Sequence, residues 1–242
     1  MTLSRLLSTS CYELSGDRLD KAKAITFTIM FETAQFMKHL SKLYRDTYIT
    51  PLPSSVAGIV GAILGIERCK LRDFACEKGL LAGSAILGYE GTVDETMTVV
   101  KLKGWKEFIR APKRNILLYK PRYKMAIASP DAEVVGELED RLRRLSFEYE
   151  VFGGSDYNFV AEVGEPQRAR LTLARAGHGY CRVESLEGIE GSGTVHLDQV
   201  NEAGLSRYAF GYRVTLKLKR EALAVDDGEH VIFVHRSWIF LT

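Results

Sequence analysis

The sequence lacks an apolar run long enough to cross a membrane. Its most apolar run, VAGIVGAILGI at 56–66, is about half of the roughly 20 residues that a bilayer-spanning helix needs, and Glu67-Arg68 ends it. The first twenty residues lack a compact apolar stretch followed by a small-residue cleavage site, so no signal peptide is predicted. These absences predict a cytoplasmic protein with no membrane partner.

Cysteine and histidine patterns also exclude whole classes of site. The four cysteines are scattered and form no C-x-x-C pair, which argues against a zinc ribbon or a disulfide framework. Four of the five histidines lie after residue 170, too far apart for a metal-ligand motif. The apolar glycine-rich run is not followed by the Lys and Ser or Thr of a phosphate-binding P-loop. We therefore expect no metal and no cofactor.

Net charge is only +2, so total charge does not indicate a nucleic-acid binder. The distribution of charge is more informative, because residues 101–124 hold nine basic residues and one acid, Glu107. Four aromatic residues are interleaved with them, namely Trp105, Phe108, Tyr119 and Tyr123. Rings that stack on bases and cations that pair with phosphates suit single-stranded RNA. The alternative is a solvated surface hairpin whose lysines bind nothing.

The order of predicted elements indicates an α+β fold. Apolar residues alternate over 23–31, as in a half-buried strand, and 131–146 forms an amphipathic helix with Leu145 on its apolar face. With a helix at 56–65 and strands within 80–91, 96–128 and 149–163, the order is βαββαβ, that of a ferredoxin-like (RRM-type) domain. The expected division is an N-terminal extension (1–20), a ferredoxin-like domain (21–165) with a projecting basic hairpin at about 92–128, and a small C-terminal β region (166–242).

The stretch 31–66 joins three kinds of chemistry. A basic and aromatic segment is followed by a Pro-rich turn and then by the apolar helix. Ser54 or Ser55 is placed to cap that helix, and glycines at 58, 61 and 65 predict a face that another backbone approaches closely. A helix N-terminus beside Lys and Arg also suits a phosphate group.

Two segments resemble a known family. The run AQF-M-K, YRDTY and PLPSSVAGIVGAILGI resembles the N-terminal signature of the fifth CRISPR-associated protein family, a RAMP-superfamily subunit of type I Cascade complexes. Met37-Lys38 stands where that family often has Arg, and Ser54-Ser55 where it often has Pro-Thr. The turn Gly153-Gly154-Ser155-Asp156 resembles the family's Gly-x-Ser-Glu signature, with Asp156 in place of Glu.

This resemblance implies a non-catalytic subunit that binds the 5′ repeat-derived handle of the CRISPR RNA (crRNA). It also implies contacts with the Cascade backbone subunit, the large subunit and target DNA near the protospacer-adjacent motif. Together with the basic hairpin, it predicts an RNA-binding set of Lys38, His39, Lys42, Tyr44, Arg45, Tyr48, Ser54, Ser55, Lys101, Lys103, Trp105, Lys106, Arg110, Lys113, Arg114, Lys120 and Arg122. Tyr44, Tyr48 and Trp105 are the candidates for stacking on bases.

Two other functions compete with this one. One branch of the family is a metal-independent endoribonuclease that uses a Tyr near the first helix and a Lys-His pair near the hairpin. Tyr44 or Tyr48 could supply the Tyr, but residues 100–130 contain no histidine and only His39 is near the first helix. The third reading, an RNA-binding module unrelated to CRISPR, requires both signatures and the basic hairpin to be coincidences.

Overall fold

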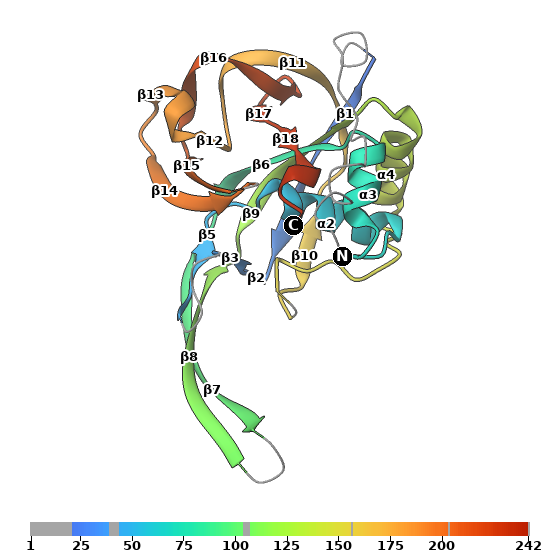
Figure 1. Ribbon diagram of the computed structural model, residues 1–242. Coiled ribbons are helices and arrows are strands. Elements are labelled where there is room, and N and C mark those ends of the chain that lie inside the picture. The colour runs from blue at the N-terminus through green and yellow to red at the C-terminus, as the bar shows by residue number, and fades with distance from the viewer. Residues whose placement is uncertain (1–20, 39–43, 104–106, 156, 203, 242) are drawn as a thin grey trace, which may run out of the picture.

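A large, strongly curved sheet forms the body of this mixed α/β protein (Figure 1). The computed structural model describes residues 21–38, 44–103, 107–155, 157–202 and 204–241. The main path of the sheet runs β12-β15-β6-β9-β1-β11-β16-β13, and β10, β14, β17 and β18 pair beside it. Strand β13 is the last strand of this path, and β14 pairs with β15 near the other end. Because only residues 191–193 join β13 to β14, the two ends lie close together and the sheet is nearly closed on itself.

The strands of this sheet are β1 (Lys23–Phe31), β6 (Leu81–Gly88), β9 (Arg122–Ser129), β10 (Val160–Val163), β11 (Gln167–Gly177), β12 (Tyr180–Arg182), β13 (Leu186–Glu190), β14 (Thr194–Asn201), β15 (Leu205–Tyr212), β16 (Thr215–Asp226), β17 (Val231–Phe233) and β18 (His235–Arg236). The described residues form three α-helices, α2 (Pro53–Leu64), α3 (Leu71–Glu77) and α4 (Ala132–Arg144), and the short 3-10 helices η2 (Val183–Ser185) and η3 (Ser237–Ile239). None of these helices is long and apolar enough to cross a bilayer.

Strand β1 has the predicted alternation and lies in the middle of the sheet, antiparallel to β9. Ile25, Phe27 and Ile29 are almost fully buried on the face covered by α2 and α4. Ala24 packs on the opposite face, against Val225 of β16 and its neighbours. Large side chains therefore meet the helices, and small ones allow the C-terminal strands to approach.

Helix α2 begins earlier than predicted, and its glycines differ from one another in role. Its N-cap is Leu52, with Pro53 in the first turn and no side-chain cap, so neither Ser54 nor Ser55 is the cap. A Cβ at Gly61 would lie 2.8 Å from Leu71 Cδ1, whereas one at Gly58 would meet no atom within 4 Å. Gly65 ends the helix at φ +78°, a conformation that favours glycine. A second backbone does approach the end of α2, where the N–H groups of Glu148 and Tyr149 donate to the carbonyls of Ile63 and Ala62, but the three glycines do not form the expected common face for it.

Helix α4 confirms the amphipathic pattern, apart from its end. Asp131 caps it by accepting from the backbone N–H groups of Glu133 and Val134. The predicted face is buried at Val134, Val135, Leu138 and Leu142. Leu145 is instead 61% exposed, because it follows the last helical turn in a left-handed conformation and points away from the core.

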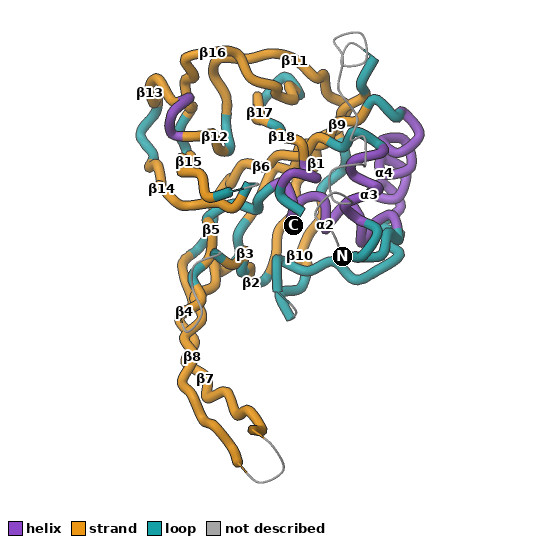
Figure 2. Tube along the Cα trace, in the orientation of Figure 1, coloured by secondary structure: helices purple, strands orange, loops and turns teal. Residues whose placement is uncertain are grey.

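The predicted hairpin is a long arm that projects from the body, as both views of the chain show (Figure 1; Figure 2). Strand β7 (Gly91–Lys103) pairs with β8 (Glu107–Tyr119) from Gly91↔Tyr119 to Lys103↔Glu107. The expected extent to residue 128 is wrong, because residues 122–129 form β9 between β1 and β6 in the body. Lys124 is therefore not an arm residue.

Strands after residue 166 continue the same sheet. Strand β11 pairs with β1, and β15 meets β6 through Tyr212↔Ile86. Strands β15 and β16 are separated by a turn in which Arg213 has φ +55°.

A buried ion pair joins these C-terminal strands to the centre of the sheet. Lys124 Nζ lies 2.8 Å from Asp227 Oδ2, with side chains that are 5% and 0% exposed. Thr26 Oγ1 donates to the same carboxylate over 2.8 Å, and the His230 N–H donates to Asp227 Oδ1. Burial acts to raise the pKa of Asp227, but the hydrogen bonds from Lys124, His230 and Thr26 outweigh it and hold that pKa below its usual value.

The ion pair predicts a pH-dependent stability. Asp227→Asn keeps the shape but leaves Lys124 uncompensated, so at pH 7 we expect the free energy of unfolding in urea to fall by roughly 3–5 kcal/mol. Because the folded-state pKa is depressed, this contribution is complete above the unfolded carboxylate pKa of about 3.9 and is lost as the pH falls through the folded-state value. The difference between wild type and variant should therefore shrink below about pH 4.

The matched control is Asp140→Asn, on the exposed side of α4. A loss of stability at pH 7 no larger in Asp227→Asn than in this control would show that the buried pair does not hold the sheet together.

Candidate nucleic-acid interface

The segment after β1 wraps around the root of the arm. Its strands are β2 (Thr33–Ala34), β3 (Phe36–Met37), β4 (Tyr44–Arg45) and β5 (Thr47–Tyr48). Strand β2 pairs with β8 at its body end, β4 runs parallel to β8 at Tyr44↔Arg114 and Arg45↔Asn115, and β3 pairs with β5. The fold thus places Tyr44 and Arg45 next to Arg114. All three were predicted to bind RNA, but from two separate parts of the sequence.

Tyr44, Arg114 and Asp94 form a cluster at this root. The Arg114 guanidinium carbon lies 5.2 Å from the centre of the Tyr44 ring, which leaves Tyr44 42% exposed. Arg114 Nε also donates to both carboxylate oxygens of Asp94, over 2.7 and 2.8 Å. These hydrogen bonds hold the pKa of Asp94 below its usual value and compensate the charge of Arg114. The exposed ring is available to a base, while Arg114 is already paired.

The other basic residues of the arm do not share one face. Successive side chains of a strand point to opposite sides, so Arg110 and Arg114 lie on one face of β8 and Lys113 on the other. Arg110 is exposed. Nearer the body, Lys120 lies 3.7 Å from Glu90 and Arg122 lies 3.2 Å from Glu162. The basic residues near β8 are therefore divided between two faces, and several of them are paired with acids.

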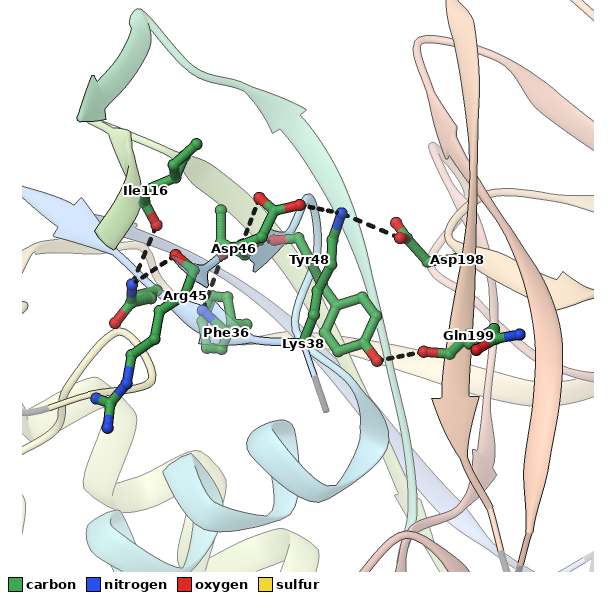
Figure 3. A network of polar contacts seen from close by, with 10 residues as sticks. Phe36, Lys38, Arg45, Asp46, Tyr48, Ile116, Asp198 and Gln199 are labelled. Carbon is green, nitrogen blue, oxygen red and sulfur yellow. Dashed lines mark hydrogen bonds and ion pairs between the residues drawn. The ribbon is translucent and has the colours of Figure 1, made fainter. Parts of the chain in front are cut away.

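Two further predicted residues tie the arm root to the C-terminal strands (Figure 3). Lys38 Nζ lies 2.7 Å from Asp46 Oδ2 and 3.0 Å from Asp198 Oδ1. Partial burial acts to lower the pKa of Lys38, but the hydrogen bonds to the two carboxylates outweigh it and raise that pKa. The Tyr48 hydroxyl donates to the Gln199 carbonyl of β14 over 2.5 Å, and its ring is 1% exposed. Both side chains are engaged inside the protein in this conformation.

Gln35 lies at the centre of the root, although it was not among the predicted site residues. Its side chain is 3% exposed and its Nε2 donates to the carbonyls of Ile116 on β8, over 3.2 Å, and Arg45 on β4, over 3.4 Å. Its Oε1 accepts from Ser155 Oγ over 3.2 Å, and its backbone N–H donates to the Gly153 carbonyl over 2.7 Å. The available signal was its place inside the AQF segment of the family-like signature.

The glycine turn of the second signature packs directly on this residue. Gly154 has φ +96°, and a Cβ there would lie 2.1 Å from the Gln35 carbonyl oxygen. A Cβ on Gly153 would lie 2.9 Å from the Thr33 carbonyl oxygen. The two signatures, far apart in the sequence, are thus in contact, and glycine is required where they meet. Asp156, the last residue of the turn, lies outside the described residues.

A cavity of about 770 Å³ opens beside this contact. Ser54 and Ser55, in the first turn of α2, line it together with Phe36, Gly154 and the basic pair Arg68 and Arg72. The first turn of α2 carries no acidic residue. The positive end of the helix dipole and two arginines therefore border one hollow, together with the acidic Glu150.

Several predictions fall beyond what the structure describes. His39, Lys42, Trp105 and Lys106 lie outside the described residues, and for Lys101 and Lys103 only the backbone, within β7, is described. Within the described ranges, no group of three or more His, Cys, Asp or Glu side chains is arranged to hold a metal ion.

Comparison with known proteins gives only distant similarities. No family model matches the chain, and no curated protein matches it. A solved structure described as a Cas protein aligns with 81% of this chain and 95% of its own, at 15% identity and a TM-score of 0.45. A chain of a CRISPR RNA-guided surveillance complex aligns with 80% of this chain and 90% of its own, at 14% identity and a TM-score of 0.47. The functionally uncharacterised protein SMU1763c from Streptococcus mutans aligns with 88% and 93%, at 10% identity and a TM-score of 0.38. Similarities this low assign no function.

The close approach of Gly154 predicts a sharp sensitivity to a single methyl group. Gly154→Ala places a Cβ against the Gln35 carbonyl and forces an alanine to adopt φ +96°, so we expect a fall of about 2–4 kcal/mol in the free energy of unfolding. The control is Gly58→Ala in α2, where a Cβ meets no atom within 4 Å and helix propensity favours alanine. Equal urea midpoints for the two variants would contradict the tight contact between the signatures.

Proposed function

We propose that this chain is a cytoplasmic, non-catalytic subunit of a type I CRISPR Cascade complex that binds the 5′ handle of crRNA at the root of its arm. The observation that carries the proposal is the contact between Gln35 and Gly153-Gly154, which joins the two segments that resemble the fifth CRISPR-associated family. If the two segments resembled the family signatures only by chance, they would have no reason to pack on each other. Their contact is expected if both belong to one functional site.

The connections of the central strands support the fold that the resemblance implies. Strands β10, β1, β9 and β6 lie side by side in that order, and each neighbouring pair is antiparallel. Helices α2 and α3 lie between β1 and β6 in the chain, and α4 lies between β9 and β10. This is the order of a ferredoxin-like βαββαβ domain with one extra helix, which we propose as the core of the protein.

The chemistry of the arm root supports single-stranded RNA as the ligand. Tyr44 offers an exposed ring beside a guanidinium. Any of the four bases can stack on such a ring, because every base has a flat aromatic face. Arg110 and Lys113, one on each face of β8, extend positive charge along the arm. We assign Tyr44 to stacking and these two side chains to phosphates. Lys38 and Tyr48 instead support the segment that carries Tyr44.

The arm also suits contacts with neighbouring subunits. Met97 and Val100 on β7 are 40% and 53% exposed, far from the core that would otherwise cover them. Apolar side chains on a projecting hairpin favour burial against another protein, and we propose the backbone and large subunits as those partners. Contact with target DNA beside the protospacer-adjacent motif belongs to the same proposed assembly.

The endoribonuclease alternative requires a base for the ribose 2′-OH and a group that stabilises charge at phosphorus. Tyr48 is buried and donates its hydroxyl to Gln199, which leaves Tyr44 as the exposed tyrosine of the pair. The experiments below therefore follow RNA length as well as RNA binding.

The first test is to purify the tagged chain from its native host and to sequence the RNA that accompanies it. We expect small RNAs that share one repeat-derived 5′ end, together with larger protein subunits. Adding the purified chain to repeat RNA should leave its length unchanged. RNA with heterogeneous ends, or no RNA, would exclude the Cascade role, and shortened RNA would favour the endoribonuclease.

The second test reverses charge on the arm. Arg110→Glu combined with Lys113→Glu should weaken RNA binding by about tenfold or more at low salt and reduce the steepness of its salt dependence by about one unit per lost phosphate contact. Arg114 is left intact, because reversing it would set two acids against each other at Asp94. The control is Arg144→Glu at the exposed end of α4. If the double variant binds like this control while circular dichroism shows both folded, the arm does not bind RNA.

A further inference from the structure

The arm is joined to the body by two short connections. Residues 89–90 lead from β6 into β7, and residues 120–121 lead from β8 into β9. Gly88 and Gly91 flank the first connection, and a Cβ at either glycine would meet no atom within 4 Å. In the second connection Lys120 has φ +45°, outside the usual strand region. The second connection is also held by the backbone, because the Lys120 N–H donates to the Glu32 carbonyl over 2.9 Å and the Phe31 N–H donates to the Pro121 carbonyl over 3.2 Å.

Side-chain contacts at the root add to the backbone pairing of β8 with β2 and β4. Gln35, between β2 and β3, holds β8 and β4 through its Nε2 and the Gly153–Ser155 turn through its Oε1 and backbone N–H. The amide nitrogen of Gln35 donates to two carbonyls, and its amide oxygen accepts from one hydroxyl, so both ends of the amide are hydrogen-bonded. Turning the arm would leave these groups unpaired in a site where Gln35 is 3% exposed, and such loss is costly.

We propose that Gln35 is a positioning residue, whose amide holds β8 to the Gly153–Ser155 turn and, with the backbone pairing of β8 to β2 and β4, sets the direction of the arm relative to the body. Where the arm root binds RNA, as proposed above, Gln35 also sets the geometry of that binding without touching the ligand. It links the turn of the second signature to both strands that carry Tyr44 and Arg114. This role explains why the two signatures meet at a side-chain amide.

A second attachment of the same segment makes the role testable in a folded protein. Lys38 and Tyr48 tie β3 and β5 to Asp198 and Gln199 of β14, independently of Gln35. Removing the Gln35 amide should therefore loosen the hold on β8 at Ile116 and let the arm move more relative to the body, while the supporting segment and the β2–β8 and β4–β8 pairing stay in place. The hydrogen bonds of the β1–β9 core are not involved.

The test uses the full chain with Gln35→Met, which keeps length and removes both polar groups. The matched control is Gln199→Met, the same change at an exposed side chain whose backbone carbonyl, not its amide, receives Tyr48. Spin labels on ketone-bearing amino acids at Val100 of the arm and Glu133 of α4 report the arm-to-body distance without disturbing the cysteines. Both positions are exposed. If Gln35→Met fails to fold, Ser155→Ala removes one of the same hydrogen bonds.

We expect one narrow distance distribution in wild type and Gln199→Met and a broadened or shifted one in Gln35→Met, with thermal unfolding still cooperative. Binding of a labelled single-stranded RNA with the host's repeat sequence should weaken about tenfold in Gln35→Met, the equivalent of about 1.4 kcal/mol. An unchanged distance distribution would overturn the positioning role. A broadened distribution with unchanged RNA affinity would support the positioning role and overturn RNA binding at the arm root.

Discussion

The structure of the site depends on the approach of the Gly153-Gly154 turn to the backbone of residues 33–36. Gly154 adopts φ +96° and leaves no room for a Cβ beside the Gln35 carbonyl. This contact fixes Gln35, and Gln35 in turn holds the two strands at the base of the arm. This steric constraint at one glycine and the backbone pairing of β8 with β2 and β4 together place a hairpin that extends far from the body (Figure 1).

Charge in this protein serves mostly to join its parts. Lys124 and Asp227 connect the C-terminal strands to the middle of the sheet, and Lys38 connects the arm root to β14. Arg114 is paired with Asp94 on the arm itself. Because pairing leaves less charge for a ligand, the residues that bind RNA are better sought among exposed cations such as Arg110 than by counting all the lysines and arginines.

Some elements could be predicted from the sequence because local periodicity determines them. Alternation over 23–31 and the apolar spacing of 131–146 are set by the geometry of a strand and a helix, and both elements were confirmed. The cap of α2 and its glycine face were wrong, because Pro53 is itself the first helical residue and the surroundings of each glycine come from distant segments. The count of basic residues over 101–124 did not reveal that they are divided between two faces, because side chains alternate along β8.

The sequence by itself determined the central strand, the two main helices, a basic arm and two segments that resemble one family. Only the tertiary structure decided that β9 belongs to the body, that Tyr48 is buried and that Gln35 joins the two signatures. Local patterns report which face of an element is apolar, since that depends on nearby residues alone. They do not report which distant backbone lies against a given glycine or amide, because that is settled only when the strands pair and the turn closes on them.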